Sequence, residues 1–432
     1  MEADMAAKII SRSEKTFTIQ IEVPYSKSML QSEETIQVCL NEGGVLATQE
    51  ALGRFDSDGS PIMIGKTKLT SKGKVDKIYQ SAYGEVAIQR HVYQTSAGGR
   101  MFCPLEKDAR IVGTCTPKFA KMISHKYSDL GALRVMRDLE ENHGRKIVRS
   151  FVQNISELVG LVATAKEENW EYELPPSDAA IKTVSVGMDG TCTLMCEDGW
   201  RETMVGTLGY FDGDGNRVHT TYCAAIPEYG KSNFLTRLER EVSRAKEQFP
   251  KAHFIGLADG AKANWEFLET HTETQILDFW HAAGYIAKAA DAMFKGKTKN
   301  QAKAEWQDDA CHKLKNTHGA ASRLLTEMKE FIDSKKMSSE DRIQLNEAIT
   351  YFNNQKSRMK YAKHVEDGLP IGSGITESAC KVIVKQRLCN SGMKWEKTGA
   401  SVVLSLRCLT YSVNRWEQFW QKIDQYGLSL AA

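Results

Sequence analysis

The chain of 432 residues has no window of about 18 consecutive apolar residues, so we expect no membrane-spanning helix. The first residues, MEADMAAKIISRSEK, lack the apolar core of a signal peptide, which argues against secretion. The ten cysteines include no CxxC pair. These three absences predict a cytoplasmic protein with reduced thiols and no membrane partner.

Zinc is the one metal that the cysteine content brings into question, because thiolate and imidazole are the ligands it prefers. A zinc site could be formed by Cys103, Cys115, His91 and His125. The spacings between these residues match no compact ligand knuckle, so reduced core thiols are the better interpretation.

A large excess of charge is also absent, since the formal net charge is +2. The distribution is more informative than the sum. Residues 1–99 hold 11 Lys/Arg and 12 Asp/Glu, residues 100–150 hold 11 and 6, and residues 355–415 hold 11 and 4. Two separate basic regions are what a DNA-binding surface needs, and two solvated helical faces are the alternative.

Three acidic residues have the order and spacing that a two-metal nuclease requires. Asp189 lies in the apolar run TVSVGMDG, Asp259 ends HFIGLADG, and Glu377 lies in the helix-forming GSGITESACKVIVKQ. Two aspartates at strand ends and one helical glutamate can converge on a pair of Mg²⁺ ions, for which Mn²⁺ could substitute, and activate water or a 3′-hydroxyl against a phosphodiester. The alternative is that both Asp-Gly pairs begin turns.

The segments around these acids alternate in the order of a ribonuclease H fold. Three antiparallel strands are expected from 181 to 226, followed by a helix, a short apolar strand that ends at Asp259, a second helix, and the strand TQILDFW. Asp189 would lie on the first, central strand. Residues 281–365 are helical and charged without a strand signal, which predicts a helical insertion between Asp259 and Glu377.

Two helices on either side of Asn142-His143-Gly144 predict a helix-turn-helix over residues 128–164. Apolar residues recur on each helix, with Leu130, Leu133, Met136 and Leu139 on the first and Val148, Val152, Ile155 and Val159 on the second. Four polar side chains near the start of the second helix would meet phosphates or base edges, namely Arg145, Lys146, Arg149 and Gln153. A helical hairpin without a DNA partner is the alternative.

We therefore expect an α/β protein with several parts. These are an α+β region that binds DNA ends (1–127), the helix-turn-helix (128–164), a linker with a Pro-Pro pair (165–180), the first part of the catalytic domain (181–280), the insertion (281–365) and the C-terminal part of the catalytic domain (366–432), ending in a helix over about 399–422.

Further candidates lie close to the acids in sequence. Asp278 and His281 form an Asp-x-x-His pair that either caps a helix or orients the metal ligands. Lys381, Lys385 and Arg387 would neutralise phosphates near the cleaved bond. A tryptophan could stack on a flipped base, although apolar packing is the more common role; the candidates are Trp280, Trp306, Trp420 and Trp395, which follows Lys394.

Several motifs together resemble DDE transposases of bacterial insertion sequences, in particular the Kra-type family. The motifs are VGMDG, ADGAKANW, LDFWHAA, PIGSGITESACKVIVKQRL and SGMKW, preceded by YGEVAIQRHVY, FCPLE, TPKFAKMISHKYSDL and RDLEENHGRKIVRSFVQ. The resemblance covers most of residues 80–420 and is weakest in the first 75. One departure is Gly284, which stands where a stronger helix former is expected.

The resemblance implies a ribonuclease-H-like catalytic domain that acts on the terminal inverted repeats of a mobile element. By motif position, the catalytic acids are Asp189, Asp259 and Glu377, and the Asp-x-x-His element is Asp278 and His281. It also implies duplex DNA as partner, both transposon ends and target, a homodimer or larger assembly on that DNA, and a place at the bacterial nucleoid. A domesticated DNA-binding protein that has lost the reaction is the alternative, and the intact acids argue against it.

Overall fold

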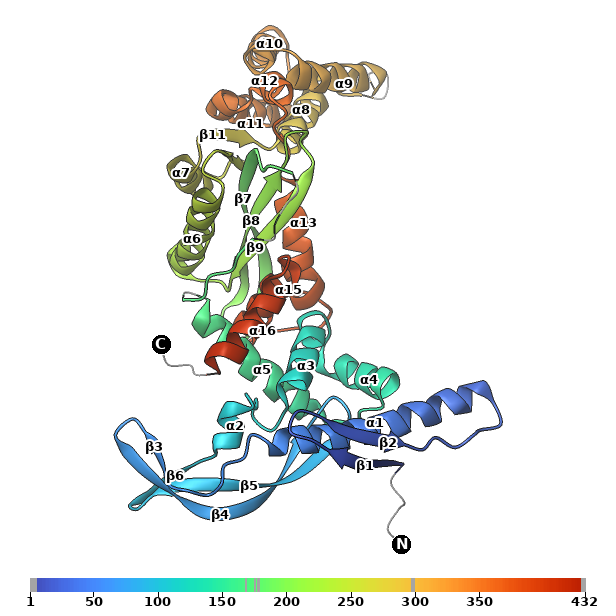
Figure 1. Cartoon of the computed structure of the whole chain (residues 1–432). Helices are drawn as coiled ribbons and strands as arrows, with labels where there is room; N and C mark the ends of the chain where they lie inside the picture. Colours follow the sequence, from blue (N-terminus) through green and yellow to red (C-terminus); the bar gives the residue numbers. More distant parts are fainter. Residues whose placement is uncertain (1–5, 168, 175, 177–178, 297–299, 429–432) are drawn as a thin grey trace. The chain divides into compact units, whose positions relative to one another are not determined.

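The computed structural model describes residues 6–167, 169–174, 176, 179–296 and 300–428. Its mixed α/β fold divides into two compact units, each considered by itself (Figure 1). The first unit comprises the chain up to Tyr172 together with Ser401–Thr410 and the residues from Arg415 onwards. The second comprises Glu173–Ala400 and Tyr411–Asn414, so the division falls within the expected linker.

The first unit contains two antiparallel sheets and several helices. A hairpin pairs β1 (Ala7–Arg12) with β2 (Phe17–Ile21), and a four-stranded sheet has the order β3 (Ile62–Ile64), β4 (Thr67–Gln80), β5 (Glu85–Thr95), β6 (Gly98–Phe102). The helices before the division are α1 (Met29–Gly53), α2 (Pro104–Asp108), α3 (Pro117–Asp129), α4 (Ala132–His143) and α5 (Arg149–Lys166). Strand and helix signals in the first 127 residues thus form an α+β arrangement.

The expected pair of helices after Ser128 is present as α4 and α5, with different limits. The first helix begins at Ala132 and ends at His143, and its C-cap Gly144 has a φ of 63°, the left-handed conformation that glycine adopts at helix ends. Its buried residues are Val135 and Leu139, whereas Leu133 is 54% exposed, so the expected stripe of every third residue is wrong. On α5 the expected stripe is confirmed for Val152, Ile155 and Val159, which are buried, but not for Val148, which precedes the helix as its N-cap and is 64% exposed.

The second unit is built on one mixed sheet with the strand order β11-β10-β7-β8-β9. The strands β7 (Thr183–Met195), β8 (Gly199–Phe211) and β9 (Arg217–Ala225) are antiparallel neighbours. The short strands β10 (His253–Ala258) and β11 (Thr274–Leu277) extend the sheet in parallel with β7. Two helices connect these strands, α6 (Ser232–Gln248) before β10 and α7 (Lys262–His271) after it, in the expected order of elements.

Glycines on the sheet let one helix approach each face closely. A Cβ on Gly206 would lie 2.8 Å from Leu238 of α6, and a Cβ on Gly209 would lie 2.8 Å from Ile375 of α13 (Gly374–Ala379). The two glycines are three residues apart on β8 and therefore face opposite sides of the sheet. Figure 1 shows α6 and α7 beside one face of this sheet and α13 beside the other.

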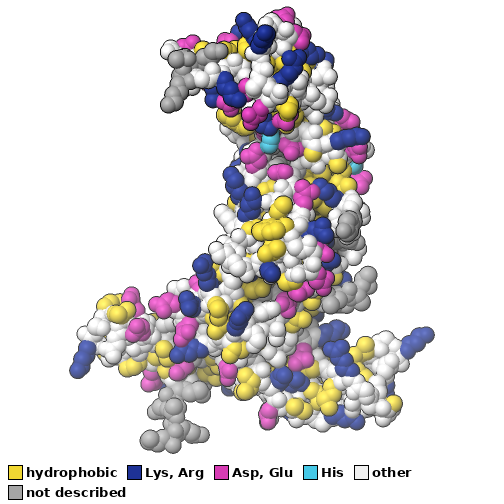
Figure 2. Space-filling model, turned by 180° about the vertical axis from the view of Figure 1, so that it is seen from behind, with side chains coloured by type: hydrophobic (Ala, Val, Ile, Leu, Met, Phe, Trp, Pro, Cys, Tyr) yellow, Lys and Arg dark blue, Asp and Glu magenta, His cyan; other side chains and the backbone are white. Residues whose placement is uncertain are grey.

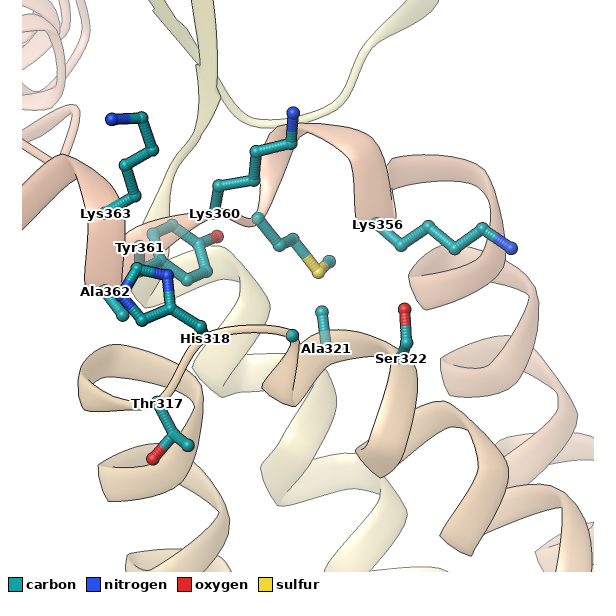
Figure 3. A pocket seen from close by; sticks show the side chains of 11 residues that line it. Thr317, His318, Ala321, Ser322, Lys356, Lys360, Tyr361, Ala362 and Lys363 are labelled. Atoms are coloured by element: carbon teal, nitrogen blue, oxygen red, sulfur yellow. The ribbon is translucent and has the colours of Figure 1, made fainter.

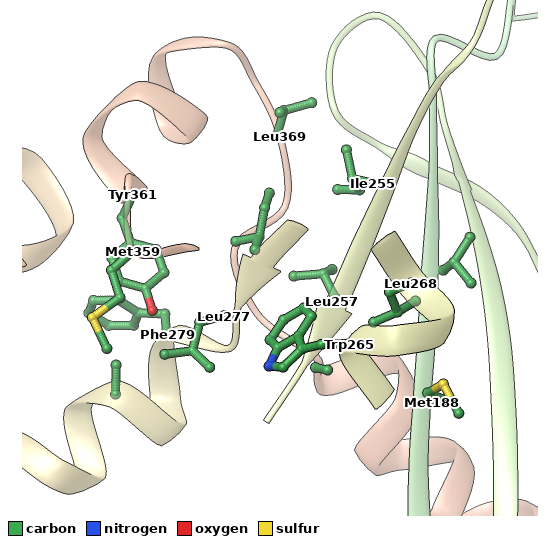
Figure 4. Close-up of a cluster of buried hydrophobic side chains, with 14 of the residues drawn as sticks. Met188, Ile255, Leu257, Trp265, Leu268, Leu277, Phe279, Met359, Tyr361 and Leu369 are labelled. Atoms are coloured by element: carbon green, nitrogen blue, oxygen red, sulfur yellow. The ribbon is translucent and has the colours of Figure 1, made fainter. Parts of the chain in front are cut away.

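The segment 281–365 is helical in its described residues, as expected from the sequence. It consists of α8 (Phe279–Met293), α9 (Asn300–Asn316), α10 (Ala320–Ser334), α11 (Ser339–Gln355), the short 3₁₀ helix η3 (Lys356–Arg358) and α12 (Tyr361–Glu366). A continuous apolar core joins these helices to the sheet, with Leu257 and Trp265 at one end and Phe279, Met359 and Tyr361 at the other (Figure 4). None of the helices in the described part of the chain is long and apolar enough to cross a membrane.

The C-terminal segment differs from the expectation in two respects. A single helix over about 399–422 is wrong, because α15 (Lys397–Tyr411) and α16 (Arg415–Tyr426) are separated at Asn414, whose φ is 61°. Residues 401–410 and those from 415 pack with the first unit, whereas all of 366–432 was expected in the catalytic domain. The reason is direct contact, since Arg407 donates to the Ser128 carbonyl and the Asp129 carboxylate, each at 2.7 Å.

Candidate active site

Asp189 lies on β7, and Asp259 directly follows the end of the neighbouring strand β10. In the parallel β7–β10 ladder Gly187 pairs with Leu257, and each aspartate lies two residues beyond its member of this pair. Both acids therefore lie just beyond the last residue pair of this ladder, Asp189 within β7 and Asp259 in the bend after β10. Burial raises the pKa of Asp189, and the negative charge of Asp259 raises it further.

The carboxylate of Asp189 is held by the next residue of β7 and by Cys380. Its Oδ1 accepts a hydrogen bond from the Gly190 N–H at 2.7 Å, and its Oδ2 lies 3.7 Å from the Cys380 Sγ. Burial raises the pKa of the Cys380 thiol to about 12, so the thiol stays protonated and donates to the carboxylate. Cys380 comes three residues after Glu377, about one helical turn. The residue that contacts Asp189 is therefore one turn away from Glu377 on the same helical segment.

Close packing at Gly187 fixes α13 against β7. A Cβ on Gly187 would lie 2.1 Å from the Thr376 Oγ1 and 3.1 Å from the Thr207 Oγ1, so only glycine leaves room for the helix here. The two threonine hydroxyls are hydrogen-bonded to each other at 2.8 Å. Thr376 directly precedes Glu377, so this contact determines the height of the glutamate above the strand that carries Asp189.

We expect Gly187→Ala to lower the free energy of unfolding by about 1–3 kcal/mol, because the added methyl group forces the buried Thr376 and its helix away from the sheet. Urea denaturation measures this effect. The matched control is Gly213→Ala, where a Cβ would meet the Lys182 side chain at 3.7 Å, an ordinary contact. Equal stability of the two variants would contradict the close packing described for α13.

Glu377 lies in the first turn of α13 and is partly buried. Its N–H donates to the Ser373 carbonyl at 3.0 Å, and its Oε1 accepts from the Ser373 hydroxyl at 3.4 Å. The helix then continues as the π-helical segment η4 (Cys380–Lys385) and the short α14 (Gln386–Leu388). A π-helical turn inserted into an α-helix is frequent at functional sites, and here it begins three residues after the glutamate.

Asp278 connects the start of α8 to the loop before α13. It is fully buried, and its Oδ1 accepts from the His281 N–H at 2.7 Å while its Oδ2 accepts from the Ser373 N–H at 2.5 Å. Burial alone would raise the pKa of Asp278, but the hydrogen bonds from His281 and Ser373 outweigh it and lower the pKa to about 2. Asp278 therefore caps α8 and at the same time positions the segment that carries Glu377.

Asp278, His281 and Glu377 offer ligand atoms that all lie within 4.8 Å of one another. Both Asp278 oxygens already accept backbone N–H groups, so this carboxylate is better suited to hold its neighbours than to bind an ion. The His281 Nδ1 lies 3.4 Å from the Asp278 Oδ1, which orients the ring and leaves Nε2 free. The hydrogen bond with Asp278 raises the pKa of His281, and the charges of Asp259 and Glu377 raise it further.

The turn after β10 is held by the helical insertion. The Asp259 carbonyl accepts from the Tyr351 hydroxyl at 2.8 Å, and the Gly260 carbonyl accepts from the Gln355 side chain at 3.1 Å. Gly260 has a φ of 113°, a backbone conformation open to glycine. Both donors come from α11, so the insertion fixes the backbone of the loop that carries Asp259.

The acid cluster, defined as Asp189, Asp259 and Glu377, has no basic partner. Within the ranges that the structure describes, no Lys or Arg forms an ion pair with any of the three, although Asp278 pairs with His281. Carboxylates gathered without a cation repel one another, and hard oxygen ligands are those that Mg²⁺ and Mn²⁺ prefer. The residue types therefore suit divalent ions, but in the described ranges only Asp278, His281 and Glu377 place ligand atoms within 4.8 Å of one another, and Asp189 and Asp259 lie outside this group.

The basic residues expected near the cluster divide into exposed and buried ones. Lys381, Lys385 and Lys394 are exposed. Arg387 is 3% exposed and packs over the Trp395 ring at 5.2 Å, so it is not free to meet a phosphate. Trp395 is equally structural, because its Nε1 donates to the Leu388 carbonyl and its backbone bonds to β7 at Leu194. Stacking of Trp395 on a base is therefore not supported.

The residues expected to bind DNA in and just before α5 also divide into exposed and buried ones. Lys146, Arg149 and Gln153 are exposed. Arg145 is buried, and it donates to the Ser81 carbonyl at 3.1 Å and to the Gln80 side chain at 2.7 Å. On the face shown in Figure 2, Lys and Arg side chains are interspersed with Asp and Glu side chains. Arg145 is thus a structural residue, contrary to the expectation from its sequence position.

We expect Arg145→Ala to lower the free energy of unfolding by about 2–4 kcal/mol, because it leaves buried acceptors of the 80–81 segment without their charged donor. Lys146→Ala is the matched control and should change stability by less than about 0.5 kcal/mol, since Lys146 is exposed. Thermal or urea unfolding of both variants gives the comparison. A stable Arg145→Ala protein with weakened DNA affinity would restore the original interpretation.

The four residues considered for zinc do not gather. Cys103 and Cys115 are buried free thiols, and burial raises the pKa of each. The His91 Nδ1 is bonded to the Asp56 carboxylate at 2.9 Å. Across the described ranges, Asp278, His281 and Glu377 are the one group with metal-ligand spacing, so the interpretation as core thiols is supported.

Sequence reasoning missed the residues that hold the acids in place. These are Gly187, Ser373, Thr376 and Cys380 around the helix, and Tyr351 and Gln355 on α11. Only the first group had a visible signal, since a glycine within an apolar strand marks a close approach. Tyr351 and Gln355 lie four residues apart on one helix face, a spacing that is equally common in structural helices.

A separate basic pocket of about 300 Å³ lies in the helical insertion, between the start of α10 and the η3–α12 segment (Figure 3). Lys356, Lys360, Lys363 and His318 are among its lining residues. His318 pairs with Glu366 at 2.9 Å and Lys363 with Asp367 at 3.0 Å, so two of these four groups already have partners. The pocket is distinct from the acid cluster, although its residue Tyr361 contacts Phe279 at the start of α8.

The chain matches no known family model and no curated protein. The geometry of the acid cluster and the motifs around it therefore carry the functional argument.

Proposed function

We propose that this protein is a DDE-type transposase that cleaves and joins DNA at the ends of an insertion sequence. The observation that carries the proposal is the acid cluster. Asp189 lies on β7, Asp259 follows the end of the paired strand β10 and interacts electrostatically with Asp189, and Glu377 lies one helical turn before Cys380, which contacts Asp189. The motifs around these acids are those that resemble the Kra-type family.

Two finer structural assignments belong to this proposal. The sheet order β11-β10-β7-β8-β9, with the first strand in the centre and the parallel strands β10 and β11 on one side of it, supports a ribonuclease-H-like catalytic domain. The helices α4 and α5, joined at Gly144, support a helix-turn-helix that would present Lys146, Arg149 and Gln153 to DNA. We assign end recognition to the first unit and the reaction to the second.

The residues of the second unit have complementary roles in the reaction. Asp189, Asp259 and Glu377 would hold a pair of Mg²⁺ ions. When bound, such ions polarise a phosphodiester and lower the pKa of an attacking water or 3′-hydroxyl. Asp278 fixes the His281 ring and the Ser373 backbone, and His281 can hold a proton at Nε2. The exposed Lys381, Lys385 and Lys394 attract the phosphate backbone.

Transposition requires two element ends to be joined in one complex. We therefore propose that the protein acts as a homodimer or larger assembly on duplex DNA, with the inverted repeats bound before target DNA. This function places the protein at the bacterial nucleoid, in the cytoplasm.

The test is a cleavage and joining assay with purified full-length protein, Mg²⁺ and duplex DNA carrying the inverted repeats that flank its gene. We expect nicks at the repeat boundary and joined products in a second DNA, both abolished by EDTA. Absence of nicking by the intact protein would contradict the proposal and favour a silent DNA-binding protein. Nicking without joined products would instead indicate a nuclease.

A further inference from the structure

Trp280 is the most exposed tryptophan of the second unit and lies inside the candidate active site. Its side chain is 70% exposed, whereas Trp265 is 3% exposed in the same unit. It stands between Asp278, which caps α8, and His281, whose ring lies beside Glu377. Single exposed apolar residues are common on protein surfaces, so exposure alone does not indicate a binding site. The position of Trp280 between Asp278 and His281 is the more specific observation.

The indole is held in place and keeps its ring faces open. Phe279 meets it in an edge-to-face arrangement, with ring centroids 5.5 Å apart at 75°. Its five-membered ring lies beside Gly372, where a Cβ would be 3.5 Å from the Trp280 Cδ1. Among the ring contacts of the described residues, Phe279 is the one aromatic neighbour, and it leaves neither indole face covered by stacking.

The first turn of α8 also has a fixed backbone. Asp278 binds the His281 N–H and the Ser373 N–H, and the Phe279 N–H donates to the Ile371 carbonyl at 3.0 Å. A flat apolar surface on such a rigid segment loses little conformational freedom when a ligand covers it. Trp280 is therefore suited to bind a planar group next to the acid cluster.

We propose that Trp280 is a stacking platform for an unpaired nucleobase of the DNA end. This inference rests on the proposed function, which brings a phosphodiester to Glu377 and His281. The base attached to that phosphate then lies within reach of the adjacent residue on the same helical turn. A paired base exposes no ring face inside a duplex, so the ligand must be single-stranded or flipped out. Stacking accepts any base, so Trp280 contributes affinity and position without reading sequence.

The chain contains a matched control for this role. Trp200, near the start of β8, is 64% exposed in the same unit. It pairs with Leu194, five residues along β7 from Asp189, or about 16 Å at the usual rise per strand residue. Trp200 thus has the same chemistry and exposure at a distance from the acid cluster.

The experiment measures binding of the full-length protein, in EDTA, to two fluorescent oligomers of about twelve nucleotides. One is an oligothymidylate, and the other has the same phosphates with abasic sugars. We expect the oligothymidylate to bind more tightly. Trp280→Ala should weaken that binding by about 5- to 100-fold with little effect on the abasic oligomer, and Trp280→Phe should restore part of it. Trp200→Ala should leave both affinities unchanged.

Three results would overturn the proposal. The first is that Trp280→Ala and Trp200→Ala change the affinity equally. The second is that Trp280→Ala weakens binding of both oligomers by the same factor. The third is that Trp280→Ala changes the sedimentation of the protein without changing its affinity, which would show that a second copy covers the indole. The cleavage assay separates the two claims. If the intact protein nicks DNA but Trp280→Ala binds normally, the stacking role fails alone. If base-dependent binding requires Trp280 but no nicking occurs, the proposed reaction fails instead.

Discussion

Asp189→Asn should lower the rate of Mg²⁺-dependent nicking by at least about 10³-fold while leaving the fold intact. The amide keeps the oxygen that accepts the Gly190 N–H, so this contact within β7 is preserved. It removes the negative charge that would hold a divalent ion between the two paired strands. Single-turnover nicking of end DNA, measured beside the unchanged protein, gives the ratio of rates.

The same substitution should not reduce stability in the absence of divalent ions. Burial and the nearby charge of Asp259 raise the pKa of Asp189, so its ionised form is disfavoured in the folded chain. A folded pKa above the unfolded one means that stability is lost as pH rises through it, and a neutral amide avoids this loss at pH 7. Asp198→Asn is the control, since Asp198 pairs with Lys397 at 3.3 Å on the β7–β8 turn. An Asp189→Asn protein that nicks DNA as fast as the Asp198→Asn control would contradict the role of Asp189 as a ligand of the divalent ions.

Asp278→Asn should lower the free energy of unfolding at pH 7 by about 2–4 kcal/mol, with or without Mg²⁺. The carboxylate accepts hydrogen bonds from two backbone N–H groups in a fully buried site. In the asparagine variant one of these N–H groups faces the amide NH₂, which is also a donor, and loses its hydrogen bond. Ser338→Ala removes an N-cap of α11 that accepts one N–H, from Asp341 at 3.1 Å, and should cost about 1 kcal/mol. Urea denaturation of the two variants compares the free energy lost with Asp278, which accepts two backbone N–H groups, with that lost with Ser338, which accepts one.

The pH dependence of stability gives a second measure of Asp278. Burial raises its pKa, but the hydrogen bonds from His281 and Ser373 prevail and lower the pKa from 3.8 to about 2. A lowered folded pKa stabilises the fold above the unfolded pKa, and this contribution, about 2 kcal/mol, is lost as pH falls from about 4 towards 2. The loss in that range should be smaller by this amount in Asp278→Asn. An unchanged pH profile would show that Asp278 is not the charged cap described above.

The sequence predicts the elements of the second unit well because their signals are local. The apolar run before Asp189, the short buried strand before Asp259 and the glycine-flanked start of the Glu377 helix each mark an element by composition. The break at Asn414 was missed since asparagine is tolerated within a helix, and its φ of 61° depends on tertiary contacts.

Side-chain roles were harder to predict because they depend on contacts between distant segments. Arg145, Arg387 and Trp395 have the residue types and spacing of a DNA-binding surface, yet backbone carbonyls and aromatic rings from elsewhere in the chain bury them or hold them in place. The sequence allows Asp278 to be either a helix cap or a residue that orients the metal ligands. In the structure it caps α8 through the His281 N–H and also holds the Ser373 N–H of the segment that carries Glu377. Trp280 was placed with three other tryptophans, and its exposure sets it apart.

Iron-directed cleavage of the polypeptide tests the central claim most directly, because Fe²⁺ can occupy oxygen-rich divalent-ion sites and generates radicals that cut the nearby backbone. With ascorbate and peroxide, we predict cuts close to residues 189, 259 and 377, all suppressed by excess Mg²⁺ and lost together in Asp189→Asn. Cuts confined to the neighbourhood of Asp278 and His281, or persisting unchanged in Asp189→Asn, would contradict a shared ion site formed by the three acids.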